Sequence, residues 1–459
     1  MNPFLVRNLV FPLHEALLKR PTFSYLESLE RTQYLDREQI ERLQMEKLRK
    51  LLTTAHAHTP WYRRLIDEAG LDLSAERPLT LEDLRRLPTM DKHTATEHGG
   101  EMVWKEVPGG AHPYNTGGSS GEPLRFHFGR WRQASDAAGR MRARRWWGEN
   151  VGEREVYLWG APVELDRTDR IKTFRDRLFN QMVLNAFEMS PRQMDDYIEA
   201  IEGYQPRCIY GYASSIALLA AHALDRGRKP RLRHLRVVCT TGEPLYPHQR
   251  EIIREAFGAP TANEFGSRDI GFTAHETPEG QMLLMSESII LEVLDPRGNP
   301  VAPGETGEAV ITGLCSEAQP FVRYRTGDMV KLSEEPASGG RGLHVIAEVA
   351  GRTTDFVVRA DGAIMHALAV IYEIRDKPGV AEFRFIQHDL EHAEVQVVPG
   401  PAWKGADSEA AIVHDLKARL GDGVQVEIRL MEQIPPSASG KHRYVVSHVA
   451  EAHLPGQAS

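Results

Sequence analysis

Cysteine is scarce in this chain. Its 459 residues include only three cysteines, Cys208, Cys239 and Cys315, which are far apart in the sequence. This spacing makes neither a disulfide framework nor a zinc knuckle, and it predicts a reducing, cytoplasmic environment. The sequence also contains no His-Glu-x-x-His and no Cys-x-x-Cys. We therefore expect no structural zinc site.

An excess of positive charge is missing as well. The chain has 56 lysines and arginines against 64 aspartates and glutamates, a formal net charge of −8 at pH 7. A general nucleic-acid-binding protein usually has a net positive charge, because it must neutralise phosphates. This composition therefore argues against a nucleic-acid partner.

Long hydrophobic runs are absent too. The longest apolar stretch, residues 212–224, contains serines and a histidine. It is too short to cross a bilayer, and we expect no transmembrane segment. Residues 1–18 are apolar but interrupted by Arg7, His14 and Glu15, and they lack a small-residue cleavage site. We favour a helix packed on its own domain, and an amphipathic helix that touches a membrane stays an alternative.

Hydrophobic residues make up 41% of the 459 positions. This is enough for a large core and for two or more domains. Residues 41–56 are predicted to form a helix, because Leu48, Leu51, Leu52 and Ala55 fall on one face. Residues 131–147 are predicted to form a second helix, rich in arginine. We interpret those arginines as a solvent-exposed face, and a basic surface for a phosphorylated cosubstrate is the alternative. They are Arg132, Arg140, Arg142, Arg144 and Arg145.

From residue 156 onward, predicted strands and helices alternate. Residues 208–211 end a strand, and residues 214–224 follow as a helix with Ser214 as its N-cap. Residues 237–241 form a β-prone run that ends at Gly242, before a further helix through residue 256. This alternation predicts an α/β domain with a largely parallel sheet, in which ligands gather at the carboxyl ends of the strands. Short strands at 289–294 and 308–312 indicate a β-rich subdomain over residues 282–331.

Two loops carry candidate binding chemistry. The stretch Asn115-Thr116-Gly117-Gly118-Ser119-Ser120-Gly121-Glu122-Pro123 has the composition of an anion cradle, in which glycines let backbone N–H groups crowd around a phosphate and hydroxyls add donors. Ser439-Gly440-Lys441, near the far end of the chain, supplies a cation. The first loop is not a Walker A loop, because the only Gly-Lys pair is Gly440-Lys441, without the flanking residues of that motif. Together the loops suggest a protein that grips a nucleotide triphosphate in one domain and brings a lysine from another.

Four further segments occur in a fixed order with the first loop. They are Glu264-Phe265-Gly266-Ser267-Arg268-Asp269, Tyr324-Arg325-Thr326-Gly327-Asp328, Gly351-Arg352-Thr353-Thr354-Asp355 and Ser437-Ala438-Ser439-Gly440-Lys441. This set resembles the adenylate-forming superfamily of acyl-CoA synthetases, luciferases and adenylation domains. The length and the stretches beginning at Tyr210 and Thr241 resemble its phenylacetate–CoA ligase branch, in particular members associated with capsular polysaccharide gene clusters.

The resemblance implies an α/β fold in two parts. A large N-terminal α/β domain with a β-rich subdomain, residues 1–352, would bind nucleotide and acyl group. A small mobile C-terminal α+β lid, residues 353–459, would carry the catalytic lysine. A dimer is common in this branch, so the resemblance allows a homodimer, although no coiled-coil heptads or obvious hydrophobic face in the sequence support one.

The resemblance also implies a role for each motif residue. Lys441 would be catalytic, meeting the carboxylate oxygen and the α-phosphate where charge builds as pyrophosphate leaves. Phe265 would form an aromatic wall for the purine, Asp328 would accept hydrogen bonds from the ribose hydroxyls, and Arg352 would reach the ribose or the α-phosphate. Asp269 would ligate Mg²⁺ through oxygen. The remaining implied ATP contacts are Thr116, Gly117, Gly118, Ser119, Ser120 and Gly121 at the β- and γ-phosphates, Gly242, Glu243 and Pro244 at the adenine, and Gly266 and Ser267 beside the aromatic wall.

Three positions depart from the family pattern. Glu122 stands where a lysine is frequent, Asp269 where a glutamate is usual, and Thr354 at a hinge that is commonly aspartate. A carboxylate at position 122 would repel phosphates, so we expect it to point away from them or to meet a cation. The shorter Asp269 side chain would shift the metal ion or bind it through water, and a hinge needs only a residue that absorbs a backbone rotation.

The implied reaction joins ATP and a small-molecule carboxylic acid into an acyl-adenylate, with release of pyrophosphate. A thiol, best matched by coenzyme A, then takes the acyl group. The branch favours aromatic acids, and Tyr212, Ala213, Trp159 and Gly160 are candidates for the acyl pocket. One alternative keeps adenylation but uses an amine, a hydroxyl or a carrier-protein thiol as acceptor. A second is a nucleotide-binding scaffold without catalysis.

Overall fold

The computed structural model describes residues 1–74, 76–115, 124–159, 175–186, 189–352, 356–360, 364–366, 368–375, 377–434 and 444–449. The chain divides into two compact units. The first comprises Met1–Glu292, Val310–Thr326 and Lys331–Val349, and the second comprises Val293–Ala309, Gly327–Val330 and Ala350–Ser459.

Helices dominate the first hundred residues. They are α1 (Pro3–Leu5), the π-helical η1 (Val6–Val10), α2 (Phe11–Leu17), α3 (Thr22–Thr32), α4 (Arg37–His58), α5 (Pro60–Glu68), α6 (Leu81–Arg85), α7 (Lys92–Glu97) and α8 (Gly99–Met102). Helix α4 contains the predicted helix 41–56 and starts earlier, because Asp36 and Gln39 form a capping box at its N-terminus. The predicted face, from Leu48 to Ala55, is buried.

The N-terminal segment packs one face on its own unit. Val6 is buried, and the Phe11 ring stacks on Phe179 with 4.7 Å between ring centroids. The other face carries exposed apolar side chains four residues apart, from Leu5 to Leu17. None of the helices in the described part of the chain combines the length and apolar character that a membrane span requires.

A hairpin of β1 (His112–Asn115) and β2 (Arg125–Phe128) precedes α9 (Arg130–Trp146). The two strands are antiparallel, with Asn115 opposite Arg125. The Gly/Ser/Thr loop connects them in sequence, and its residues 116–123 lie outside the described residues.

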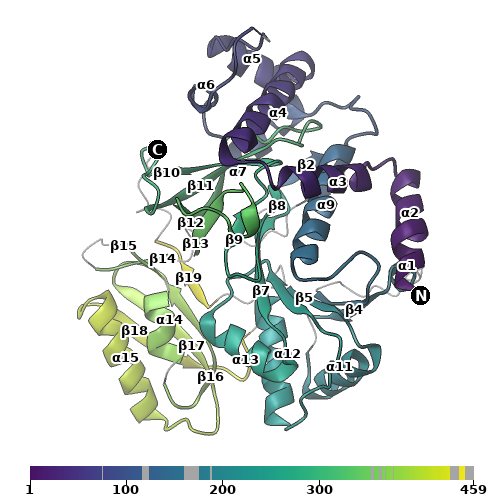
Figure 1. The fold of residues 1–459 in the computed structure, drawn as a ribbon. Coiled ribbons are helices and arrows are strands. Elements are labelled where there is room, and N and C mark those ends of the chain that lie inside the picture. The colour runs from purple at the N-terminus through teal and green to yellow at the C-terminus, as the bar shows by residue number, and fades with distance from the viewer. Residues whose placement is uncertain are drawn as a thin grey trace. The chain divides into compact units, whose positions relative to one another are not determined.

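Eleven strands of the described chain form the main sheet, in the order β10-β11-β12-β13-β9-β8-β7-β6-β5-β3-β4 (Figure 1). Their bounds are β3 (Glu155–Trp159), β4 (Gln181–Asn185), β5 (Cys208–Tyr212), β6 (Val237–Thr241), β7 (Thr261–Ser267), β8 (Gly271–Glu276), β9 (Met282–Leu284), β10 (Ile289–Leu294), β11 (Thr306–Gly313), β12 (Tyr324–Ser333) and β13 (Val345–Arg352). Strands β4, β3, β5, β6 and β7 pair in parallel. The pairs β7–β8, β8–β9 and β9–β13 are antiparallel. The predicted parallel sheet is therefore confined to the α/β part, and the predicted β-rich region continues it.

Helices α11 (Pro191–Tyr204), α12 (Ala213–Asp225) and α13 (Pro247–Phe257) lie next to the parallel strands in Figure 1. Their apolar residues pack on one face of the sheet, where Ile198, Ile216 and Ile253 meet Leu158 and Ile209. Burial of each such side chain stabilises the fold by roughly 1.5–3 kcal/mol. The alternate residues of these strands face the other side of the sheet. Cys208 and Tyr210 of β5 and Cys239 of β6 are among them. All three cysteines of the chain are buried and free.

The prediction that the arginines of α9 form a solvated face was wrong. Arg132, Arg142 and Arg144 are buried, and the side chains of Arg140 and Arg145 are about one-third exposed. Each is paired with a carboxylate, so the alternative of a basic surface is not supported either. The pairs are Arg132–Asp136, Arg140–Glu264, Arg142–Glu287, Arg144–Glu149 and Glu155, and Arg145–Glu30. Buried guanidinium groups need such partners, because an unpaired buried charge is strongly destabilising.

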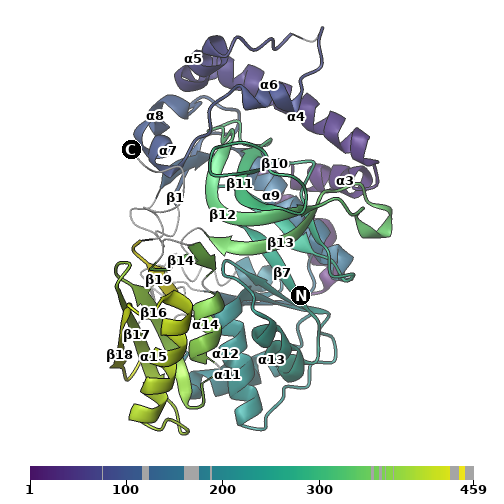
Figure 2. The same cartoon turned by 90° about the vertical axis from the view of Figure 1, so that its left-hand side faces the viewer.

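The second unit contains a sheet in the order β18-β17-β16-β19 and the short pair β14–β15. The bounds are β14 (Phe356–Val358), β15 (Ile364–His366), α14 (Leu368–Arg375), β16 (Val380–Gln387), β17 (His392–Pro399), α15 (Ala406–Leu420), β18 (Gln425–Leu430) and β19 (Val445–Ser447). Figure 2 shows α14 and α15 side by side against this sheet. The 3-10 turn η2 (Ser338–Gly340) belongs to the first unit.

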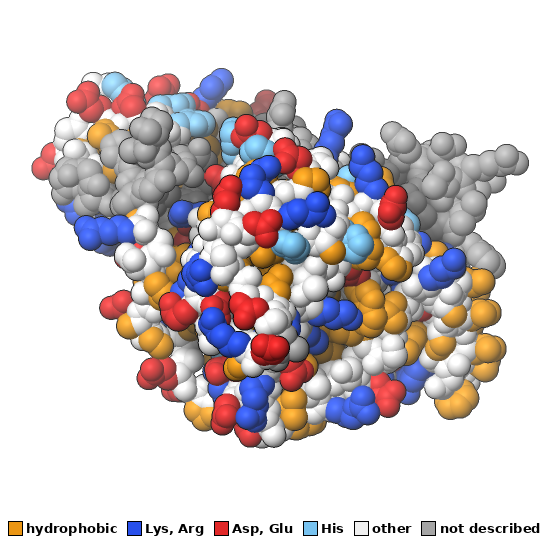
Figure 3. Space-filling view, turned by 90° about the horizontal axis from the view of Figure 1, so that it is seen from above, with side chains coloured by type: hydrophobic (Ala, Val, Ile, Leu, Met, Phe, Trp, Pro, Cys, Tyr) orange, Lys and Arg blue, Asp and Glu red, His pale blue; other side chains and the backbone are white. Residues whose placement is uncertain are grey.

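Charges of both signs share the surface around α4 and α5. In Figure 3 acidic and basic side chains are interspersed on this face. Several form exposed ion pairs, such as Arg42–Glu38 and Arg64–Glu101. Each such pair contributes little to stability, because solvent screens it. This face therefore offers no concentrated basic patch of the kind that binds nucleic acid.

Candidate nucleotide site

The predicted adenine segment follows directly after β6. Gly242 has a φ of 76°, a conformation that glycine adopts without strain. The Glu243 carboxylate then turns back and accepts a hydrogen bond of 2.9 Å from the backbone N–H of Ser214. This contact corrects the expected start of α12, which begins at Ala213 with Tyr212 as N-cap. Glu243, not Ser214, supplies the side-chain oxygen at this helix terminus, where negative charge is favourable.

A buried carboxylate network lies beneath this segment. Glu264, in the middle of β7, accepts hydrogen bonds from Tyr210 (2.9 Å) and Thr241 (3.1 Å) and pairs with Arg140 at 3.3 Å. Burial would raise the pKa of Glu264, but the charge of Arg140 and these hydrogen bonds outweigh it, and the pKa lies below its ordinary value. An ionised Glu264 thus links β5, the end of β6 and β7 to α9.

Sequence reasoning missed this network. Glu264 was part of a recognised segment but had no assigned role, and Arg140 was assigned to a solvated face. The sequence offered no local signal for it, because an arginine-rich helix has the same residue pattern whether its charges are solvated or paired with distant carboxylates.

Phe265 and Gly266 continue β7. The Phe265 side chain is buried, with 8% exposed. At Gly266 a Cβ would lie 2.3 Å from the carbonyl oxygen of Gly271, so only glycine allows the two strands to approach this closely. The segment is therefore held in a fixed backbone path beside the ends of the parallel strands.

Asp269 lies in the turn after β7. Its Oδ1 accepts a hydrogen bond from Ser267 Oγ, and its Oδ2 accepts one of 2.9 Å from Tyr324 OH. Tyr324 begins β12, the strand that carries Asp328. The oxygen donors gathered here, a carboxylate and two hydroxyls, have the chemistry that Mg²⁺ prefers. The described residues contain no group of three or more histidine, cysteine or acidic side chains placed to hold a metal, so Mg²⁺ at Asp269 would need water or phosphate oxygens to complete its coordination.

Arg268 connects this turn to the hairpin. Its Nη1 donates a hydrogen bond of 3.5 Å to the carbonyl oxygen of Asn115, the residue before the Gly/Ser/Thr loop. The end of β1 therefore lies beside the Phe265–Asp269 segment, although 153 residues separate the two partners. The predicted phosphate contacts from Thr116 to Gly121, and Glu122 with them, lie outside the described residues.

The other predicted site residues are less completely described. Asp328 is 8% exposed and lies on β12, in the part of the strand that belongs to the second unit. Arg352 is the last residue of β13. Thr354 and Lys441 lie outside the described residues. Their roles stay predictions.

Aromatic rings occupy the candidate acyl-binding region. Trp159, the last residue of β3, stacks on Tyr212 with 4.5 Å between ring centroids and an angle of 19°. Trp159 also stacks on Tyr210 at 5.8 Å. Ala213 is fully buried, and Gly160 lies outside the described residues. This stack lies at the carboxyl ends of β3 and β5, where sheet ligands bind.

Comparison with known proteins identifies the relatives of this chain. Residues 357–448 match the family described as CapK C-terminal domain. Protein CapK of Staphylococcus aureus is 21% identical over 453 residues, covering 98% of this chain and 98% of that protein. Phenylacetate-coenzyme A ligase of Thermus thermophilus is 28% identical over 454 residues, covering 90% of this chain and 97% of that protein. Among solved structures, 2-hydroxyisobutyryl-CoA ligase in the postadenylation state with R3-HIB-AMP has a TM-score of 0.71 at 21% identity, covering 91% of each chain.

The resemblance seen in the sequence is therefore confirmed. CapK and phenylacetate-CoA ligases are among the homologues of the chain, and 2-hydroxyisobutyryl-CoA ligase is among the solved structures that share its fold. The predicted mixed α/β fold, with a large sheet and a smaller C-terminal α/β part, is that of these neighbours.

Proposed function

We propose that this protein, a homologue of CapK and the phenylacetate-CoA ligases, is an AMP-forming acid–thiol ligase. It activates a carboxylic acid with ATP, releases pyrophosphate, and passes the acyl group to a thiol, for which coenzyme A is the best candidate. The observation that carries the proposal is the convergence of three motif segments in one place. Arg268 contacts Asn115 at the start of the Gly/Ser/Thr loop, and Tyr324 contacts Asp269.

We assign the remaining motif residues by the family resemblance, and each assignment has a chemical reason. Loop residues 116–121 offer backbone and hydroxyl donors for the β- and γ-phosphates. Asp328 offers carboxylate oxygens to the ribose hydroxyls. Lys441 stabilises the charge that develops as the acid attacks the α-phosphate. Mg²⁺, when bound at Asp269, would neutralise phosphate charge.

The two reaction steps need different arrangements of the C-terminal part. We propose that residues 353–459 act as a lid that brings Lys441 to the α-phosphate and then rotates to admit the acceptor, with the hinge near Thr354. ATP and coenzyme A would be drawn from the cytoplasm, where we place the enzyme. The acid is of the apolar or aromatic class, because Trp159 and Tyr212 present stacked rings beside the strand ends.

The alternative acceptor is an amine, a hydroxyl or a carrier-protein thiol, since adenylation does not fix the second step. The alternative without catalysis is motivated by the departures at Glu122, Asp269 and Thr354. The intact Lys441, Asp328 and Arg352 favour the enzyme.

The test is carboxylate-dependent ATP–pyrophosphate exchange over a panel of aromatic and aliphatic acids, with the wild type and a Lys441→Ala variant. We expect exchange with at least one acid and a loss of at least about 100-fold in the variant. A Lys404→Ala variant, at a lysine elsewhere in the second unit, is the control. Equal exchange by the wild type and Lys441→Ala would remove the proposed role of Lys441, and absence of exchange with every acid would favour the scaffold.

The acceptor is tested separately, by AMP release with the active acid. Stimulation by coenzyme A supports the thiol ligase. Release that responds to amines or sugars but not to coenzyme A would select the alternative acceptor. Size-exclusion chromatography with light scattering tests for the homodimer.

A further inference from the structure

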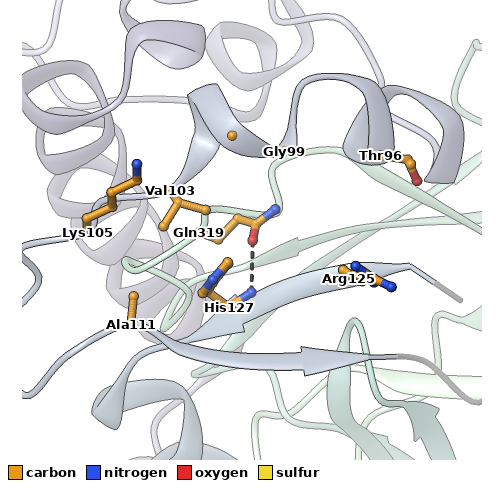
Figure 4. A pocket seen from close by; sticks show the side chains of 9 residues that line it. Thr96, Gly99, Val103, Lys105, Ala111, Arg125, His127 and Gln319 are labelled. Atoms are coloured by element: carbon orange, nitrogen blue, oxygen red, sulfur yellow. Dashed lines mark hydrogen bonds between the residues drawn. The ribbon is translucent and has the colours of Figure 1, made fainter.

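A pocket of about 370 Å³ lies in the first unit, and none of the residues that line it belongs to the predicted nucleotide site. Its walls come from α7 and α8, the segment after α8, strand β2, and the loop that carries Gln319. Figure 4 shows His127 and Gln319 near its centre, with Lys105 and Arg125 on either side. Its volume falls within the range of small-molecule sites.

Two polar atoms in the wall have no partner. The Gln319 side chain is 2% exposed. Its Oε1 accepts a hydrogen bond of 2.9 Å from the backbone N–H of His127, while its Nε2 makes no hydrogen bond in the described structure. The Nδ1 of His127 is likewise buried without a partner there. Leaving a buried polar group without a hydrogen bond is destabilising, so two such groups in the wall of one cavity point to a ligand.

The charge of the pocket is positive. Lys105 and Arg125 are exposed, and neither forms an ion pair with any carboxylate among the described residues. The described lining contains no acidic side chain. Ammonium, guanidinium and amide N–H groups together provide only donors, which is the complement of an oxyanion.

Space for a ligand is left by two consecutive glycines. A Cβ added at Gly99 would come within 3.9 Å of Gln319 Nε2, and a Cβ added at Gly100 would meet no atom within 4 Å. Side chains at these positions would enter the open volume next to the unpaired amide. Glycine thus keeps the approach to Gln319 clear.

We propose that this pocket binds a small organic anion with carboxylate or phosphate groups. Its anionic groups meet Lys105 and Arg125, and an oxygen accepts a hydrogen bond from Gln319 Nε2. Arg125 and His127 lie on β2, the strand that directly follows the Gly/Ser/Thr loop, so a bound anion contacts the stem of that hairpin. The proposal does not depend on the proposed function.

The experiment is isothermal titration calorimetry on the full-length protein without Mg²⁺, using citrate as the carboxylate probe and glycerol 3-phosphate as the phosphate probe. We expect at least one probe to bind, and the two arms identify which anion the pocket prefers. Lys105→Ala and Arg125→Ala should each weaken binding by about tenfold, the value of one charge-assisted contact. Gly99→Leu, which fills the space without changing charge, should abolish it.

The matched control is Arg192→Ala, which removes an exposed arginine at the start of α11. It should leave probe binding unchanged, and thermal unfolding of each variant confirms that it folds. Hydrogen exchange provides a second measurement, in which the bound probe should protect the amides of residues 125–128. The proposal is overturned if neither probe binds the wild type, if the pocket variants bind as the wild type does, if Arg192→Ala loses binding equally, or if β2 gains no protection. ATP binding, measured in parallel, tests the nucleotide site independently.

Discussion

We predict that the carboxyl of Glu317 makes the stability of the first unit depend on pH. Glu317 lies two residues before Gln319, next to the N-terminal end of α9. Burial raises its pKa from 4.5 to about 7, and its own backbone N–H, the charge of Lys50 and the backbone N–H of Trp131 only partly offset this effect. Its Oε1 has no hydrogen-bond partner in the described structure.

The sign of the effect follows from proton binding. Between pH 4.5 and about 7 the folded protein holds a proton on Glu317 that the unfolded chain has released, so the free energy of unfolding falls as pH rises through this window. At about 1.4 kcal/mol per pH unit, the whole interval corresponds to about 3 kcal/mol. About 2.5 kcal/mol of this falls between pH 5 and pH 8.

The assay compares urea unfolding of the wild type and Glu317→Gln from pH 4.5 to pH 8. The variant cannot ionise at this position, so its stability relative to the wild type should rise by about 2.5 kcal/mol between pH 5 and pH 8. Glu334→Gln, at an exposed glutamate, should show a flat difference. A flat difference for Glu317→Gln as well would refute the reasoning.

The comparison has to be a difference between variants, because other buried groups act in the opposite direction. Burial lowers the pKa of His275 and of His344 from 6.5 to about 4. Between these pH values the unfolded chain holds the extra proton, so their contribution to stability rises with pH. Subtracting the wild-type profile removes both contributions and leaves that of Glu317.

Two further predictions concern ion pairing and the proposed metal site. Arg142→Met should lower the free energy of unfolding, measured with urea, by about 3–5 kcal/mol, because it leaves the buried carboxylate of Glu287 without its cation. Adding Glu287→Met should recover most of this loss. Equal losses in the single and double variants would contradict the prediction. Tyr324→Phe removes the hydroxyl that donates to Asp269, a contact of about 1 kcal/mol, and should raise the Mg²⁺ concentration for half-maximal ATP–pyrophosphate exchange by about fivefold. An unchanged Mg²⁺ dependence would separate Tyr324 from the metal site.

Several parts of the fold were predictable because their signals are local. The β-prone run 237–241 is β6, and the amphipathic run 41–56 lies within α4. The order of motif segments also predicted the superfamily. The N-cap of α12 was predicted wrongly, because its oxygen comes from Glu243, 29 residues further along the chain. A local rule cannot find a cap that tertiary structure supplies.

The sequence by itself determined the types and order of the candidate binding segments, since glycines, hydroxyls and a lysine at given places along the chain are chemical facts that need no fold. Tertiary structure alone decided which charged side chains are buried and which carboxylate each of them pairs with. Arg142 meets Glu287, 145 residues away. Gln319 comes next to His127, 192 residues away, and its amide nitrogen has no hydrogen-bond partner among the described residues. The physical reason is that burial and pairing belong to packed surfaces. The five arginines of the predicted helix 131–147 have the same local pattern in water as in a core, and only packing distinguishes the two.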